Sequence, residues 1–408
     1  MTLNCYNIID GTAIDYMHCV LLGITKLLLS LWFSSEHSRD QFYIGRSASR
    51  VDKRLEEIQP PSCITRKPRS ISKHMKYFKA SEFKSFLLYY SLPLLSGILP
   101  QQYWDHHALL VIAIYNLLQH SVSPHQLDLC QTLLTKHCYQ FSRLYSERYM
   151  TANVHLLLHL PDNVRQLGPL WAYSCFSFEG QNGILKNLVH GTQQVDKQII
   201  STYSYIRSLL LAAANFSDRT CEQHFEAFKQ LYFKHNMPEQ RCKVLENVYL
   251  LGKPTRTNVT ETELLALSTY GLNQTCKYLR IIFHGFQIQS FQWKINVQKR
   301  NNSAVAYRPD RGGLEYGLVQ GFFVVEEGSS PKVYVTLTKL LKHDSVQLQM
   351  QSHPHWQIPH ITACVPPTSS SLTIAIPLEH ILSPCVYISF SDVQCVYLAI
   401  IVNLLEKD

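Results

Sequence analysis

The sequence LLVIAIYNLL at residues 109–118 sets the helical rhythm of the first half of the chain. Its apolar side chains recur mainly at spacings of three and four, the pattern of an α-helix. Similar spacings run from Asp15 to about Tyr249, with breaks where proline and glycine cluster. We therefore predict a mainly α-helical region at residues 1–250, built from helices of about 12 to 25 residues.

A different rhythm follows residues 251–275, a polar stretch that has the composition of a linker. Apolar and aromatic residues then alternate at residues 286–297, and β-branched runs recur at residues 333–336 and 385–390. This alternation is typical of short strands. The sequence predicts a small β-rich domain at residues 276–408, and hence an α+β fold for the whole chain.

Composition excludes several classes of protein. Of the 408 residues, 46% are apolar and only 17% are charged, which is far from the signature of disorder. The 12 cysteines form no CxxC pair, so neither a zinc ribbon nor a thioredoxin-type site is encoded. No signal peptide and no apolar run of about 18 residues is visible. We expect an intracellular protein with no membrane partner.

The net charge of +8 is concentrated in one strip. Between Ile58 and Ser81 there is no acidic residue, and the aromatic residues Tyr77 and Phe78 lie among the last cations. A strip of this kind can follow a phosphate backbone, although a solvated, proline-containing loop has the same composition. The candidate nucleic-acid-binding residues are Arg66, Lys67, Arg69, Lys73, Lys76 and Lys79.

Two pairs of residues have the spacing of metal ligands. His155 and His159 lie four residues apart, and Asp15 precedes His18 by three, so each pair shares one helix face. Imidazole and carboxylate suit zinc, and four such ligands would form a closed structural site. Hydrogen-bonded core histidines are the simpler reading. A zinc hydrolase is disfavoured because Leu156 stands where an HExxH motif carries its glutamate.

Glu179 follows the aromatic-rich segment WAYSCFSF, which we expect to be buried. A carboxylate in such surroundings is costly unless it is paired or bound to a metal ion. The alternative is a residue in the first turn of a helix, favoured there by the helix dipole, with Lys186 and His190 further along the same helix.

Residues 14–26, 153–161 and 168–192 together resemble the C-terminal half of CACTA-type (En/Spm-like) transposases and related transposon-derived reading frames. The resemblance extends over about residues 1–215 and more loosely over the β-rich part. It implies a ribonuclease-H-like catalytic fold with a helical insertion, in which three acidic residues hold two divalent metal ions. It also implies DNA as a partner and a nuclear location.

Within this resemblance, Asp15 and His18 match a D-x-x-H motif that follows the second catalytic acid. His155 and His159 match a histidine pair that precedes the third acid, and Glu179 matches that acid. The histidine motifs would then be structural and zinc-bound, and Glu179 would hold Mg²⁺ for DNA strand cleavage and joining.

The resemblance departs from the family where the first two acids should lie, upstream of Asp15. Neither Asp10 nor Asp105 replaces them, and one carboxylate cannot anchor two metal ions. We therefore expect a transposase-derived, DNA-associated protein that does not cut or join DNA by itself: a fragment, a decayed copy or a host-recruited derivative. Mg²⁺ would act only if a complete catalytic core were supplied.

A second hypothesis is a chromatin or protein-interaction module built on the β-rich domain. Its aromatic residues would line a groove for a protein partner, although such residues more often form the core of a small barrel. The residues concerned are Phe291, Trp293, Tyr307, Tyr316, Phe322 and Phe323.

Overall fold

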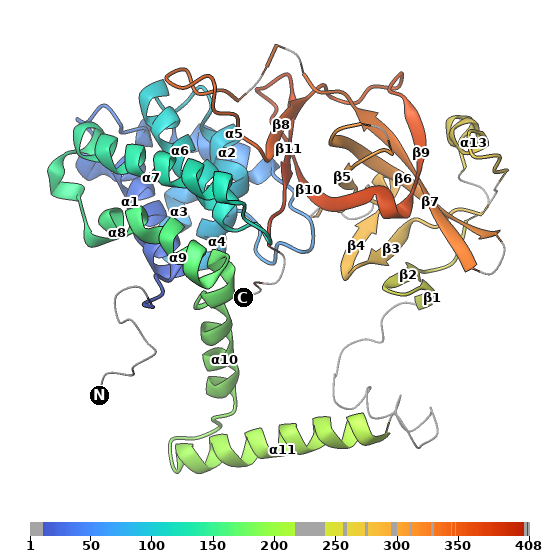
Figure 1. Ribbon diagram of the computed structural model, residues 1–408, viewed down its shortest axis with the longest axis horizontal. Coiled ribbons are helices and arrows are strands. Elements are labelled where there is room, and N and C mark those ends of the chain that lie inside the picture. The colour runs from blue at the N-terminus through green and yellow to red at the C-terminus, as the bar shows by residue number, and fades with distance from the viewer. Residues whose placement is uncertain are drawn as a thin grey trace.

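The computed structural model describes residues 11–216, 241–255, 259–273, 276–294, 300–310, 312–327, 330–343, 345–346, 348–403 and 406. A helical N-terminal half lies beside a curled antiparallel sheet formed by the C-terminal half (Figure 1). The α+β class is therefore confirmed. None of the helices in the described part of the chain combines the length and apolar composition that a bilayer crossing demands.

The N-terminal half consists of α-helices joined by short 3₁₀ and wide π-helical turns. In order they are η1 (Met17–Thr25), α1 (Lys26–Phe33), η2 (Ser35–His37), η3 (Gly45–Ser47), α2 (Ala48–Glu57), α3 (Ile71–His74), η4 (Met75–Tyr77), α4 (Ala80–Ser85), η5 (Phe86–Tyr90), α5 (Ser91–Leu95), α6 (Gln101–Leu117), α7 (Pro124–Tyr145), η6 (Glu147–Tyr149), α8 (Ala152–Leu156), η7 (Leu157–His159), α9 (Leu160–Leu167), η8 (Leu170–Tyr173), α10 (Phe176–Asn187) and α11 (Val195–Phe216).

Helices α6 and α7 form the centre of this half. Every residue of α6 from Tyr103 to Leu117 is buried, as expected of a helix that is apolar on all sides. Helix α7 begins where its sequence predicts a start, because Ser123 and Gln126 form a capping box and Pro124 occupies the first turn. The helix predicted from the pattern at residues 109–118 is thus confirmed as part of α6.

The described strands form two antiparallel sheets, one of seven strands in the order β8-β11-β10-β5-β6-β7-β9 and one of four in the order β1-β2-β3-β4. The strands are β1 (Arg241–Leu245), β2 (Val248–Leu251), β3 (Arg280–Phe283), β4 (Phe286–Gln289), β5 (Ala304–Tyr307), β6 (Glu315–Glu327), β7 (Ser330–Leu340), β8 (Ile361–Cys364), β9 (Thr373–Pro377), β10 (Ile381–Ser389) and β11 (Val396–Ile400). Two short helices, α13 (Glu261–Ser268) and α14 (Phe291–Lys294), and the 3₁₀ turn η9 (Leu378–His380) lie among them.

The larger sheet shares its core with the helices. Along β11, Tyr397 and Ala399 pack into the cluster that contains α6 and α7, whereas Val396 and Leu398 pack into a core on the opposite face. This is the two-residue alternation of a strand that is buried on both faces. The helical and β-rich parts are therefore packed together through one continuous apolar cluster. The domain boundaries near residues 250 and 276 stay predictions.

The structure corrects two sequence-based expectations. The helical pattern does not extend to Tyr249, because residues 241–251 form β1 and β2. The expected strand at residues 286–297 ends at Gln289, and helix α14 follows it; residues 295–299 lie outside the described part. At residues 241–251, pairing of β2 with β1 and β3 overrides the helical spacing of the apolar residues. After Gln289, the short helix α14 interrupts the alternating pattern of a strand.

The predicted linker at residues 251–275 contains helix α13, which is anchored in the β-rich part. Thr260 and Glu263 form its capping box, and the buried Glu263 carboxylate accepts a hydrogen bond from Lys277 Nζ at 2.8 Å. Thr336 Oγ1 donates to the same carboxylate at 2.8 Å. Because a buried charge needs such partners, this polar stretch is a packed element rather than a free linker.

Among the described residues, four histidines are buried without a charged partner: His106, His107 and His137 in the helical core, and His360, which precedes β8 and contacts that core. His106 Nε2 donates to the carbonyl of His137 at 3.0 Å, His137 Nδ1 donates back to the carbonyl of His106 at 3.1 Å, and the two rings are stacked. Burial lowers the pKa of His137 to about 4. Burial likewise lowers the pKa of His107 and His360 to about 3, and that of His106 well below its ordinary value.

These histidines should make the fold sensitive to mild acid. Because they stay neutral in the folded protein, the unfolded chain takes up protons below about pH 6.5 that the native state does not. We expect the free energy of unfolding, measured in urea, to fall between about pH 7.5 and about pH 5.5 by roughly 1.4 kcal/mol for each histidine.

His360 Nε2 donates to the carbonyl of Leu88 at 2.7 Å, and the variant His360→Gln keeps a donor for this carbonyl. The variant should reduce the fall in the free energy of unfolding by roughly 1.4 kcal/mol, the contribution of one histidine. His125→Gln, at an exposed position, is the matched control and should leave it unchanged. An equal pH dependence in all three proteins would contradict the assignment.

Candidate functional site

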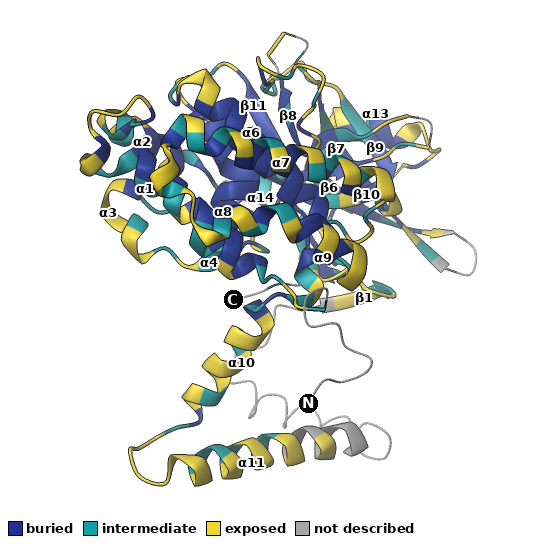
Figure 2. Cartoon of the chain, turned by 60° about the vertical axis from the view of Figure 1, so that its left-hand side comes forward, coloured by how far each residue is buried: buried dark blue, intermediate teal, exposed yellow. Residues whose placement is uncertain are grey.

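Segments from three distant parts of the sequence enclose an open groove of about 750 Å³. One wall is the π-helical turn η1, another is the loop before α4, and the third is α10, which projects from the body of the protein together with α11 (Figures 1 and 2). The lining residues are Met17, His18, Leu22, Arg66, Phe78, Lys79, Ala80, Phe176, Glu179, Gly180, Gly183, Ile184 and Asn187.

The groove brings together residues singled out by three separate sequence arguments. His18 comes from the predicted metal ligands, Arg66 and Lys79 come from the basic strip, and Glu179 is the predicted catalytic acid. The expected burial of Glu179 is wrong, because its side chain is exposed in the first turn of α10. The helix-dipole reading of Glu179 therefore fits better, although α10 ends at Asn187, before His190.

The basic strip is largely exposed, as a surface for nucleic acid requires. Arg66, Lys67, Lys73, Lys76 and Lys79 are all exposed, and the ring of Tyr77 beside them is 65% exposed.

Arg69 does not join this exposed set. It forms a two-point ion pair with the buried Glu82 at 2.6 Å, and its guanidinium lies over the ring of Phe78. Glu82 lies one residue beyond the segment 58–81, which has no acidic residue, so the composition of that segment does not show that the charge of Arg69 is neutralised. Arg69, whose side chain is 38% exposed, anchors the loop before α4 through this ion pair.

Asp15 and His18 meet at the start of η1. A carboxylate can only accept, so His18 Nδ1 donates to Asp15 Oδ2 at 2.5 Å, while Asp15 Oδ1 accepts the backbone N–H of Cys175 at 2.9 Å. Burial raises the pKa of Asp15, but the hydrogen bonds from Cys175, His18 and Met17 outweigh it and hold the pKa below its ordinary value. Asp15 therefore joins η1 to the base of α10.

His155 and His159 form a separate, exposed pair. Helix α8 begins after Thr151 and is followed by the 3₁₀ turn η7. The α-helical hydrogen bonding is interrupted there because Pro161, in the first turn of α9, lacks the N–H that a continuing helix would need. The turn brings the two Nε2 atoms to 3.3 Å from each other. Pro161 thus tightens the helix, as its position predicts.

The predicted four-residue metal set is not assembled as one site. Among the described residues, the metal-ligand atoms that all lie within 4.8 Å of one another belong to Asp15, His18 and Cys175. In that group the Asp15 carboxylate is already occupied by hydrogen bonds. The two Nε2 atoms of the histidine pair are within hydrogen-bond distance of each other, so one ring donates to the other in the absence of an ion. The same separation, about 3.3 Å, is that of two nitrogen ligands at about 2.0 to 2.1 Å from a tetrahedral zinc ion.

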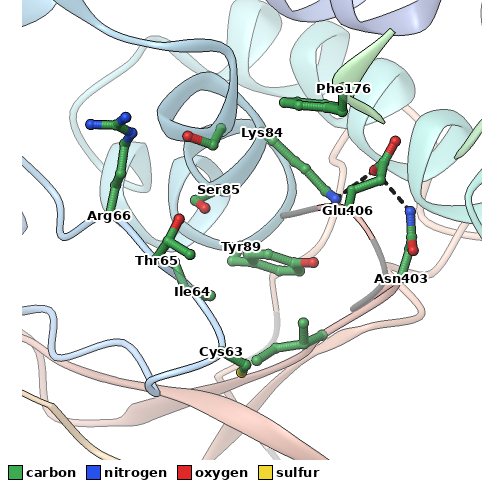
Figure 3. Close-up of a pocket in the computed structure, with 12 residues that line it drawn as sticks. Cys63, Ile64, Thr65, Arg66, Lys84, Ser85, Tyr89, Phe176, Asn403 and Glu406 are labelled. Atoms are coloured by element: carbon green, nitrogen blue, oxygen red, sulfur yellow. Dashed lines mark hydrogen bonds and ion pairs between the residues drawn. The ribbon is translucent and has the colours of Figure 1, made fainter. Parts of the chain in front are cut away.

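A buried carboxylate, Glu406, lies in a second, smaller pocket, which shares Arg66 and Phe176 with the groove. Its oxygens accept hydrogen bonds from Lys84 Nζ at 2.7 Å, Asn403 Nδ2 at 2.8 Å and Ser174 Oγ at 2.6 Å, and also from the hydroxyl of Tyr16. Figure 3 shows Lys84 and Asn403 pointing toward this carboxylate beside Phe176.

Sequence reasoning missed both Cys175 and Glu406. Cys175 stands inside the aromatic-rich block that precedes Glu179, so its neighbourhood to Glu179 was visible, but its contact with Asp15 was not. Glu406 gives no local signal, because it meets Tyr16 across 390 positions of sequence.

The aromatic residues of the β-rich part are mostly core. Tyr307, Tyr316, Phe322 and Phe323 are at most 1% exposed, whereas Phe291 and Trp293 are partly buried. The barrel-core reading thus holds for four of the six. Tyr316 also lines an open pocket with Lys342 and Trp356, and the groove for a protein partner stays a prediction.

Comparisons with protein-family models, with curated proteins and with solved structures give no match for this chain.

Substitution of Glu406 should destabilise the protein. Glu406→Ala leaves the Lys84 ammonium buried without its partner, which costs about 3 to 5 kcal/mol. We expect a correspondingly lower free energy of unfolding by denaturant titration. The double variant Lys84→Met, Glu406→Leu removes both charges and should recover much of the loss. If both proteins were equally unstable, the ion pair would not be the cause.

Proposed function

We propose that this protein binds DNA in the nucleus and derives from a CACTA-type transposase, with the phosphate backbone held along the basic strip and the mouth of the groove. The observation that carries the proposal is the convergence of Arg66, Lys79, His18 and Glu179 on one groove. These residues were singled out by the spacing of Asp15 and His18, by the composition of the basic strip and by the segment before Glu179, and the contact of Asp15 with Cys175 brings η1 next to α10.

The electrostatics of this surface favour a polyanion. Lys73 and Lys76 continue the line of exposed cations beyond the groove, and Tyr77 offers an exposed ring between cations. Cations spaced along a surface replace the counterions of a nucleic acid backbone, which provides most of the affinity of sequence-independent binding.

The proposed activity is binding rather than strand cleavage. Glu179 is the single carboxylate among the described residues that line the groove. Two Mg²⁺ ions need several converging oxygen ligands, so one exposed carboxylate does not provide the site that two-metal phosphoryl transfer requires. We therefore assign Glu179 no step through a metal ion.

Salt dependence tests this proposal directly. In fluorescence anisotropy with labelled duplex DNA, affinity should fall steeply as salt rises, and Lys79→Ala should reduce the slope of log affinity against log salt by about one. Lys342→Ala, an exposed lysine of the β-rich part, is the matched control and should leave the slope unchanged. Binding that does not depend on salt would contradict a phosphate-binding surface.

We also propose that His155 and His159 hold a structural zinc ion, since their Nε2 atoms have the separation of two ligands in a zinc tetrahedron. Such an ion would fasten the turn between α8 and α9. When bound, it would supply cross-linking rather than catalysis.

Metal analysis tests this second assignment. Protein purified with zinc should retain about one ion per chain and show a raised melting temperature, because an ion that binds only the folded state stabilises it. His159→Ala should lose both effects, whereas Asp15→Asn should keep the ion. Equal zinc content in the wild type and in His159→Ala would refute the assignment.

A further inference from the structure

We propose that the groove receives an unpaired nucleotide, with its base inside the groove and its phosphates on the basic strip. This inference rests on the proposed DNA binding and adds a preference: DNA with an unpaired segment should bind more tightly than fully paired DNA. Three features of the groove support it.

The first feature is a lining that combines apolar side chains with the charged ones described above. Leu22, Phe78 and Ile184 line the groove from three different segments, and Ile184 is 50% exposed. Its volume of about 750 Å³ lies in the range of about 300 to 1,000 Å³ of small-molecule pockets. A continuous duplex presents phosphates to such a surface, whereas an unpaired base can leave the strand and cover the apolar lining.

The second feature is the pair of glycines in α10. Gly180 and Gly183 both line the groove, and each lowers the stability of the helix relative to alanine. A Cβ atom at either position would meet nothing within 4 Å, and neither residue has a positive φ. Within the described structure, neither packing nor backbone geometry requires them. Their effect is to keep one wall of the groove open, so that a flat ligand can approach the helix backbone.

The third feature is a set of polar groups that match the edge of a base. Because Asp15 holds the Nδ1 hydrogen of His18, the Nε2 atom of His18 is left as an acceptor. The Glu179 carboxylate adds acceptors, and the Asn187 amide offers both donor and acceptor. Hydrogen-bonding groups on the Watson–Crick edge of a base are accessible to such residues only when the base is unpaired.

The test compares two probes on three proteins by fluorescence anisotropy: a labelled duplex, and the same duplex with a short unpaired segment. The wild type should bind the second probe about tenfold more tightly, since stacking and apolar contact of a base contribute on this scale. Gly183→Leu fills the groove and improves helix propensity, so it should fold and lose the preference for the probe with the unpaired segment.

Asn182→Leu is the matched control, because it places the same side chain on α10 at an exposed position outside the groove lining. It should keep the preference. Equal binding of both probes by the wild type, or a preference that survives Gly183→Leu, would overturn the nucleotide site while leaving DNA binding intact. Failure to bind either probe would instead refute the proposed function itself.

Discussion

The Glu406 carboxylate is the contact that joins the start of η1, helix α4 and the segment before α10. It accepts hydrogen bonds from Tyr16 beside η1, from Lys84 in α4 and from Ser174 at the base of α10. These residues come from three segments that lie far apart in the sequence. Because a buried carboxylate is costly without partners, the groups that surround it are held together as a set. The groove lined by His18, Lys79 and Glu179 lies between η1, the start of α4 and α10, next to this set.

The same principle operates at the junction of the two halves. Arg54 in α2 forms an ion pair with Asp392 after β10 at 3.0 Å, and His360 before β8 donates to the carbonyl of Leu88. Between these polar contacts lies one apolar cluster with members from both halves. One face of the sheet therefore packs against the helical core. Glu406, from the C-terminal half, contacts Tyr16 and Lys84 beside the groove.

Sequence periodicity predicts the parts of this structure that depend on local spacing. It places the helix through residues 109–118 and the β-rich C-terminal region, because burial imposes periods of 3.6 and 2 on the chain. It does not predict that Arg69 pairs with Glu82, nor that Asp15 meets Cys175, because such contacts depend on how the chain returns on itself. Glu179 was expected to be buried because the aromatic residues before it are apolar, but α10 leaves the body of the protein at that point.

The contact between Tyr16 and Glu406 also sets an order of events during synthesis. Ribosomes add about 5 to 20 residues per second, so the 390 positions between these residues correspond to roughly 20 to 80 seconds. Throughout that interval, the Lys84 ammonium and the Tyr16 hydroxyl lack the acceptor that they share in the finished protein. The nascent chain therefore carries its cationic strip long before residue 406 is made, and the shared contact of Tyr16 and Lys84 forms only after that residue has been added.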